Sequence, residues 1–135
     1  MNSVKLFVDD SQDFLSALSF TLPVDKGPYL FIADPAECLK CLQENNKISV
    51  IFMDNLIPPM TGLEIFEQIP DMCAERIMLT GMVDDAIVQA FHRGLIHQYL
   101  SKRDPNLIQA MLASMEVGQK NYFERYTREY SCENK

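Results

Sequence analysis

Several short apolar runs in this chain end in a polar side chain able to bind a metal ion or a phosphate. The runs and the residues that follow them are 4–8 with Asp9 and Asp10, 50–53 with Asp54, 77–79 with Thr80, and 99–101 with Lys102. The carboxyl ends of parallel strands share one edge of a sheet, which is where open α/β sheets bind ligands. Carboxylates gathered there repel one another unless a cation neutralises them. The pattern therefore predicts a cation-dependent site at the edge of a parallel sheet.

Strand-like and helix-like segments alternate along the chain. We expect strands near 4–8, 29–33, 48–53, 75–79 and 96–100, each followed by a helix. The run at 48–53 is the most hydrophobic, which is typical of a central strand covered on both faces. Five strands alternating with five helices predict an α/β fold, a five-stranded parallel sheet with helices on both faces. Either doubly wound strand order is compatible with this alternation.

Capping residues predict where the helices begin. Asp34 and Pro35 precede a helical stripe, and Glu37 completes a pattern like a capping box. The other predicted starts are Asp10 or Ser11, Thr61 with Glu64, Asp84 or Asp85, and Asp104 with Pro105.

The last predicted helix is longer than a domain of this size requires. Its apolar stripe continues into an aromatic series, Tyr122, Phe123, Tyr126 and Tyr130. One helix through this series would run about 25 residues, or roughly 37 Å. We therefore divide the chain into a domain at 1–117 and a helical extension or connector at 118–135. A frayed or folded-back tail, a dimerisation helix and a connector to an output domain all remain open.

Length and charge exclude several classes of protein. With 135 residues the chain is most simply one domain, and its net charge of −7 and pI near 4.7 disfavour direct binding to nucleic acid. No apolar run approaches the length of a membrane span, and no signal peptide is recognised. We expect no membrane association.

Cys38 and Cys41 form a CxxC pair that falls inside the predicted second helix. A thioredoxin-like pair usually leaves a strand, and a zinc site needs further ligands. Reduced, partly buried thiols are the better interpretation.

The residues at the strand ends fit one reaction. Asp54 follows the central run and could act as a nucleophile toward phosphorus. Asp10, with Asp9 beside it, would hold Mg²⁺, which prefers oxygen ligands. Lys102 would bring a positive charge and Thr80 a hydrogen bond to phosphoryl oxygens. Singly, each residue could instead be a helix cap, a turn residue or surface charge, but together they indicate phosphoryl transfer.

The same segments resemble the receiver domain of bacterial two-component response regulators, the CheY-like fold, over about 4–112. The motifs that carry the resemblance are Val8-Asp9-Asp10, the stretch 53–62 (Met-Asp-Asn-Leu-Ile-Pro-Pro-Met-Thr-Gly), Leu79-Thr80-Gly81, and 94–102 (Gly-Leu-Ile-His-Gln-Tyr-Leu-Ser-Lys). The resemblance implies the flavodoxin-like strand order 2-1-3-4-5 and a cytoplasmic setting.

It further implies a phosphorylation switch, with only weak self-phosphorylation and self-dephosphorylation as enzymatic activity. Asp54 would receive a phosphoryl group from a histidine kinase or phosphotransfer protein. Mg²⁺ would bind Asp10, Asp54 and the backbone carbonyl of Leu56. Thr80 would move toward the phosphoryl group and Tyr99 would fill the vacated space, which remodels the face of helix four, strand five and helix five. That face is where a homodimer is expected.

The sequence departs from the family pattern in two places. Arg103 follows Lys102 where the family commonly has proline, so the turn after the fifth strand is in question. Leu56 and Met82 are apolar where receivers often have polar groups. We expect this apolar rim to hinder the attacking water and prolong the life of the phosphoryl group.

Three other functions remain to be weighed. A flavodoxin-like FMN carrier would need a loop rich in Ser, Thr and Gly after the first strand, where this chain has Asp-Asp-Ser-Gln-Asp. A phosphatase of the haloacid dehalogenase type would need Asp-x-Asp, which Asp54-Asn-Leu lacks. A receiver that serves only for dimerisation, without responding to phosphate, is the third.

Overall fold

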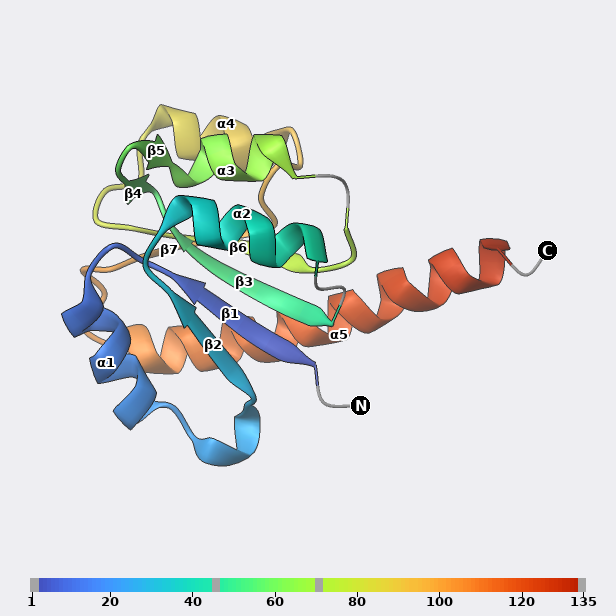
Figure 1. Cartoon of the computed structure of the whole chain (residues 1–135), viewed down its shortest axis with the longest axis horizontal. Helices are drawn as coiled ribbons and strands as arrows, with labels where there is room; N and C mark the ends of the chain where they lie inside the picture. Colours follow the sequence, from blue (N-terminus) through green and yellow to red (C-terminus); the bar gives the residue numbers. More distant parts are fainter. Residues whose placement is uncertain (1–2, 45–46, 70–71, 134–135) are drawn as a thin grey trace.

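The chain forms a five-stranded parallel sheet, seen edge-on between two layers of helices in Figure 1. This computed structural model describes residues 3–44, 47–69 and 72–133, with side chains up to residue 129. The strands in spatial order are β2 (Tyr29–Ile32), β1 (Val4–Val8), β3 (Ile48–Asp54), β6 (Glu75–Thr80) and β7 (Gln98–Ser101). Counted along the chain, this is order 2-1-3-4-5, so the predicted fold class and strand order are confirmed.

Helices cover both faces of the sheet. They are α1 (Gln12–Thr21), α2 (Pro35–Glu44), α3 (Gly62–Gln68), α4 (Asp85–His92) and α5 (Leu107–Glu133). Figure 1 shows α2, α3 and α4 on one face and α1 with α5 on the other. A short 3-10 helix, η1 (Val24–Lys26), lies in the loop before β2.

Alternating side chains of the central strands fill two separate cores. On β1, Leu6 and Val8 pack under α2–α4, whereas Phe7 faces α1 and α5. The Phe7 ring stacks on Phe52 at 4.8 Å and on Phe31 at 5.3 Å between ring centroids. All seven residues of β3 are buried, which confirms the prediction that this strand is central.

Helix caps form largely where the sequence predicted them. At α1 the cap is Ser11 rather than Asp10, because the Ser11 hydroxyl accepts the Phe14 N–H. Thr61 and Glu64 make both hydrogen bonds of the capping box that begins α3. The Asp84 carboxylate caps α4 by accepting the backbone N–H of Ile87.

One local expectation was wrong. The last helix begins at Leu107, not at Asp104 and Pro105, because the Asp104 carboxylate accepts the Asn106 N–H at 2.8 Å and holds a turn there.

The segment after Asp54 forms a short antiparallel hairpin of β4 (Leu56–Ile57) and β5 (Met60–Thr61), with Pro58 and Pro59 at its turn.

The last helix is continuous for 27 residues, about 40 Å, from Leu107 to Glu133. A folded-back tail is therefore excluded within the described residues, and the helix runs past the sheet in Figure 1. It also crosses the predicted boundary at 117/118 without a break, so that boundary remains a prediction. Within the described part of the chain, no helix has the length and apolarity needed to cross a membrane.

A buried carboxylate ties the far half of α5 to the sheet. Glu75, at the start of β6, is 1% exposed. It accepts hydrogen bonds from Arg125 at 2.7 Å and from Asn121 and Gln98 at 2.9 Å each. Charged and amide donors satisfy a buried carboxylate well. The helical extension is therefore fixed to β6 rather than free in solvent.

His97 lies beside this carboxylate as a neutral imidazole. Its Nδ1 accepts the Arg76 backbone N–H at 2.9 Å, so the same atom cannot also donate to Glu75. Burial lowers the pKa of His97, and the Arg125 guanidinium adds to that effect against the opposing pull of Glu75.

Arg125→Met should lower the free energy of unfolding by about 2 kcal/mol, because it leaves the buried Glu75 carboxylate without its cation. Urea denaturation measures this. The control is Arg93→Met, which removes an exposed ion pair with Glu67 and should change stability by less than about 0.5 kcal/mol. Equal effects of the two substitutions would show that Glu75 does not depend on Arg125.

The pKa of His97 also predicts a pH dependence of stability. Since its pKa is lower in the folded chain than in the unfolded one, the unfolded chain binds more protons below about pH 6.5. The contribution of His97 is therefore complete above that pH and is lost as the pH falls further. His97→Gln should flatten the decline in urea midpoint below pH 6.5, whereas the exposed His92→Gln should leave it unchanged.

Candidate functional site

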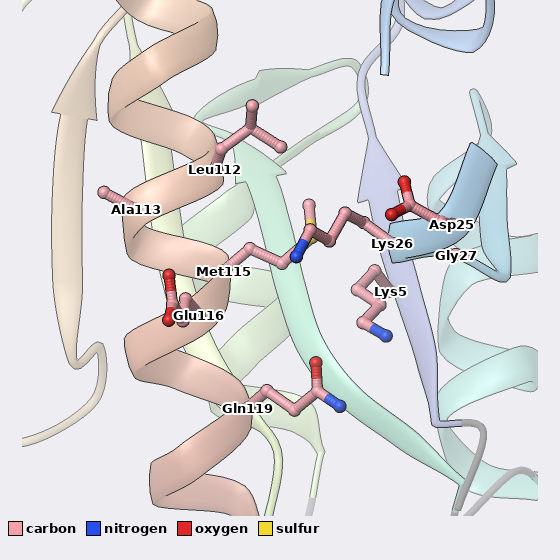
Figure 2. Close-up of a pocket in the computed structure, with 9 residues that line it drawn as sticks. All are labelled: Lys5, Asp25, Lys26, Gly27, Leu112, Ala113, Met115, Glu116 and Gln119. Carbon is pink, nitrogen blue, oxygen red and sulfur yellow. The ribbon is translucent and has the colours of Figure 1, made fainter. Parts of the chain in front are cut away.

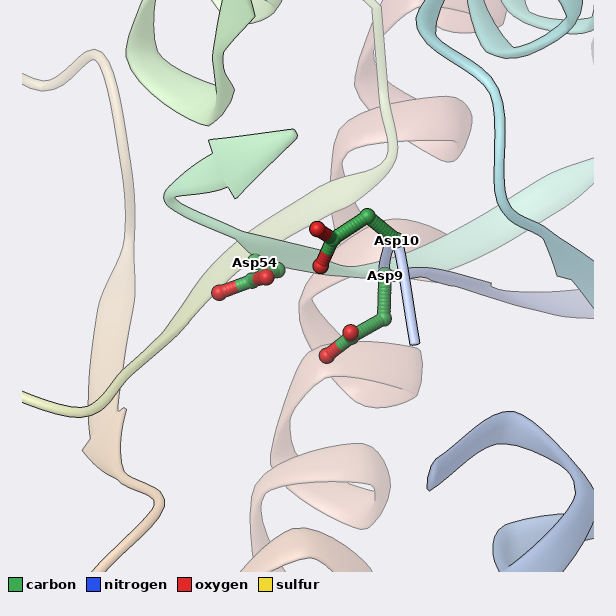
Figure 3. A group of neighbouring side chains, drawn as sticks. All are labelled: Asp9, Asp10 and Asp54. Atoms are coloured by element: carbon green, nitrogen blue, oxygen red, sulfur yellow. The ribbon is translucent and has the colours of Figure 1, made fainter. Parts of the chain in front are cut away.

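Three carboxylates meet at the carboxyl edge of the sheet, as Figure 3 shows. Asp9 and Asp10 follow β1, and Asp54 ends β3. One oxygen atom of each lies within 4.8 Å of the others. Asp9 is 2% and Asp54 8% exposed, whereas Asp10 is exposed. The sheet therefore brings together the acidic residues that the sequence placed at strand ends.

Strand register accounts for this meeting. Val8 on β1 pairs with Met53 on β3, so the next residue on each strand carries its side chain to the same edge. The following turn also starts α1, where the Ser11 N–H donates to Asp9 at 2.9 Å. That bond holds the Asp9 carboxylate below the rim while Asp10 faces solvent.

Lys102 enters the cluster from the loop after β7. Its ammonium donates to Asp9 at 2.5 Å and lies 3.4 Å from Asp54. The Lys102 backbone N–H donates to the Thr80 carbonyl at 2.8 Å, which fixes the start of the loop. The same ammonium lies 4.7 Å from the centre of the Phe14 ring on α1. Lys102 is thus held by two carboxylates and an aromatic face.

The turn that Arg103 put in question is closed by Ser101. The Ser101 hydroxyl accepts the Arg103 N–H at 3.1 Å, and its carbonyl accepts the Asp104 N–H at 3.2 Å. Proline is therefore not needed to orient Lys102 here.

The charges at this edge do not cancel. Burial raises the pKa of Asp54, and the neighbouring Asp9 carboxylate raises it further. Lys102 and a hydrogen bond from the Leu56 N–H act in the opposite direction without reversing the shift. Three carboxylates against one ammonium leave an excess of negative charge on oxygen ligands, the donor set that a hard divalent cation prefers. The residues present therefore fit a Mg²⁺ or Ca²⁺ ion.

Thr80 ends β6 and is buried beside the cluster. Its hydroxyl donates to the Met82 carbonyl at 2.7 Å and accepts the Met82 N–H at 3.2 Å. In this structure the hydroxyl thus binds its own loop, and the predicted contact with a phosphoryl oxygen would require that bond to break.

Tyr99 lies on β7, half-buried at the face shared with α4. Its ring meets Phe91 of α4 edge-on, with 5.5 Å between centroids and an interplanar angle of 88°. Tyr99, the residue predicted as an aromatic switch, therefore packs on α4, which belongs to the face that the predicted switch remodels.

The rim of the site is apolar, as the sequence indicated. Leu56 is 66% and Met82 68% exposed, and each follows a site residue by two positions. The roles predicted for the site residues, including the Leu56 carbonyl as a metal ligand, remain predictions.

Two residues contribute to the site in ways that the sequence did not predict. A Cβ at Gly62 would lie 2.4 Å from the Asp54 carbonyl oxygen, so only glycine lets α3 begin against the strand that ends in Asp54. The motif at 53–62 identified Gly62 only by its spacing from Asp54, without a structural reason. The second is Phe14, whose contact with Lys102 leaves no signal in the sequence.

The cysteine pair lies on α2, as predicted. Cys38 is buried and Cys41 half-buried, and neither is in a disulfide. Burial raises the pKa of Cys38 to about 12, which keeps it a thiol.

The fold and the acidic edge define a doubly wound α/β protein with a carboxylate site at the carboxyl ends of its strands. The family model for the response regulator receiver domain matches residues 6–113, and the chain belongs to this family. Receiver domains are signalling switches of two-component systems. Phosphorylation by a kinase is a general property of the family, and an Mg²⁺ or Ca²⁺ ion typically binds at the acidic cluster.

Solved structures with this fold include response regulators. LqsR of Legionella pneumophila is 32% identical with a TM-score of 0.86, over 96% of this chain and 47% of LqsR. This chain thus spans about half of that protein. A Rhodopirellula baltica structure described as an adenylate cyclase is 25% identical with a TM-score of 0.84, over 100% of both chains.

A Burkholderia pseudomallei response regulator was solved with a phosphorylated aspartic acid, a calcium ion and citrate. It is 26% identical with a TM-score of 0.70, over 95% of this chain and 73% of that protein. Comparison with curated protein sequences gave no match.

Gly62→Ala should lower the free energy of unfolding by about 2 kcal/mol, because the new methyl group overlaps the Asp54 backbone. Thermal or urea unfolding measures the loss. The matched control is Gly81→Ala, where a Cβ meets nothing within 4 Å and stability should stay within about 0.5 kcal/mol. A Gly62→Ala protein as stable as the control would mean that α3 can move away from Asp54 freely.

Proposed function

We propose that this chain is a phosphorylation-dependent receiver in which Asp54 accepts a phosphoryl group. The observation that carries the proposal is the position of the Asp54 carboxylate, which is buried at the sheet edge beside Asp9 and 3.4 Å from the Lys102 ammonium. A carboxylate so placed is a competent nucleophile once its negative surroundings are neutralised.

In the transfer, an Asp54 carboxylate oxygen forms a bond to phosphorus. The bond from phosphorus to its carrier breaks, and the carrier, a histidine nitrogen or an acyl oxygen, leaves with the electron pair. The product is an aspartyl phosphate, and hydrolysis by water restores the carboxylate. In this role the chain is a signalling switch rather than a conventional enzyme, with only weak self-phosphorylation and self-dephosphorylation as activity of its own.

Asp10, Asp54 and the Leu56 carbonyl would hold the Mg²⁺ ion. When bound, the ion supplies positive charge against the oxygens of the phosphoryl group. Asp9 instead holds Lys102 in place through its 2.5 Å contact. Lys102 already lies 3.4 Å from Asp54, so a short movement brings its ammonium to a phosphoryl oxygen.

The switch we propose begins at Thr80. Turning its hydroxyl toward the phosphoryl group breaks the 2.7 Å bond to Met82 and shifts the loop before α4. Tyr99, now in edge contact with Phe91, moves into the space that Thr80 leaves. The face of α4, β7 and α5 is thereby remodelled, which is a local change in charge biasing a two-state packing.

The partners follow from this function. A sensor histidine kinase or phosphotransfer protein would supply the phosphoryl group, and a second copy of the chain would dock on the face of α4, β7 and α5. Connection of α5 to an output domain is supported by its length and by the 47% coverage of LqsR.

The deciding experiment is incubation with Mg²⁺ and acetyl phosphate, followed by intact mass spectrometry. We expect one added phosphoryl group, labile to hydroxylamine, that disappears in Asp54→Asn and falls at least tenfold with EDTA. The control is Asp34→Asn, which alters an exposed carboxylate on another loop. An unmodified wild-type chain would point instead to a receiver that serves only for dimerisation.

The Lys102→Ala variant separates phosphorylation of Asp54 from the conformational change that follows it. Phosphorylation of Asp54 should persist, whereas the chemical shift changes at Tyr99 and Phe91 on phosphorylation should largely vanish, as followed by NMR. Lys40→Ala, on α2, should retain both. Undiminished shift changes in Lys102→Ala would remove Lys102 from the switch.

The apolar rim predicts a long-lived phosphoryl group. The double variant Leu56→Asn/Met82→Glu places polar groups where water attacks and should speed dephosphorylation roughly tenfold, a barrier lowered by about 1.4 kcal/mol. Loss of the added mass with time gives the rate. A rate equal to that of the parent would show that the rim does not control hydrolysis.

A further inference from the structure

A cavity of about 560 Å³ lies between α5, β1 and η1. Figure 2 shows it with its lining side chains. It opens near the start of β1, whereas Asp9 follows the other end of that strand, about 13 Å away. Its size is that of an ordinary small-molecule site, and the receiver chemistry makes no use of it.

The floor of the cavity holds a buried lysine without an anionic partner. Lys5 is 3% exposed, and its ammonium donates one hydrogen bond, to the Ser3 carbonyl at 3.2 Å. Among the residues that the structure describes, no carboxylate lies within ion-pair distance of it. A buried ammonium in this position is poorly solvated, and burial lowers the pKa of Lys5 accordingly.

Other polar groups around the cavity favour an anion at its floor. Lys26 extends from η1 and Gln119 from α5 toward the same space as Lys5 (Figure 2). The carboxylates of the lining, Asp25 and Glu116, belong to exposed residues. Lys26 is exposed as well, so Lys5 is the lining residue whose charge is buried, and the two carboxylates outnumber Lys26 at the mouth. A single negative charge therefore fits the floor, and a dianion is opposed at the entrance.

Part of the wall that α5 forms is apolar. Leu112, Ala113 and Met115 line it on one stretch of the helix. A ligand that follows this wall inward would bury an apolar part before its charged group reaches Lys5.

We propose that this cavity binds a small amphipathic monocarboxylate. The carboxylate pairs with the Lys5 ammonium, with Lys26 and Gln119 as further donors. A short apolar chain lies against Leu112 and Met115. The proposal does not depend on phosphorylation of Asp54, because the two sites lie at opposite ends of β1 and share no residue.

The probe is sodium hexanoate, titrated into the full chain labelled with ¹³C at the lysine side chains. The Lys5 signal should move saturably, while that of Lys40, on α2 across the sheet, stays fixed. Neither 1-hexanol nor sodium phosphate at the same concentration should shift it, because the first lacks charge and the second lacks the apolar part. A Lys5 signal that does not respond to hexanoate overturns the proposal, and so does an equal response to either control compound.

Calorimetry adds a second readout with variants. Lys5→Met keeps the buried volume but removes the charge, and it should weaken hexanoate binding at least tenfold. Lys40→Met should leave the affinity unchanged. Hexanoate binding of equal strength in Lys5→Met and wild type overturns the proposal. The titration of the wild-type lysine signals stands by itself if Lys5→Met does not fold.

Discussion

The contact between Lys102 and Asp9 is the interaction on which the site depends. Parallel pairing of β1 and β3 forces two carboxylates into one buried edge, where like charges repel. Lys102 follows the edge strand β7, and its ammonium pairs with Asp9, the more deeply buried of the two carboxylates. Asp54 is left in a negative environment, with a pKa raised by burial and by Asp9. This excess of negative charge around Asp54 favours a bound cation at this position.

Much of this could be predicted because strand ends are visible in a sequence. The positions of Asp54, Thr80 and Lys102 after apolar runs gave the edge and its chemistry. The pairing of Lys102 with Asp9 could not be predicted, since it depends on how far the lysine side chain reaches past the two strands between them, β3 and β6. The approach of Gly62 to the Asp54 backbone likewise exists only once α3 is packed. Local hydrogen bonding, as in the turn at Asp104, displaced a helix start that propensity alone had favoured.

A charged side chain is buried at each end of β1, and the two charges have opposite signs. At its carboxyl end, the buried Asp9 charge is paired within the chain. At its amino end, the buried Lys5 charge has only a carbonyl oxygen and an adjoining cavity. The two ends of β1 are therefore two places where a ligand of opposite charge would be stabilised: a cation at the acidic edge and an anion at Lys5. One belongs to the family chemistry and the other to this chain's own side chains.

The ties of Arg125 and Asn121 to Glu75 have a mechanical consequence for α5. They act as a fulcrum about 27 Å from Leu107 and about 12 Å from Glu133, at 1.5 Å per residue. Sideways displacement at the Lys102 end would arrive at the other end reversed and reduced by roughly half, by the ratio of these lengths. Because Asn121 and Arg125 lie four residues apart on α5 and both bond Glu75, the same ties also resist rotation of the helix about its axis. The last two turns of α5 are therefore shielded from both kinds of motion at the carboxyl edge of the sheet.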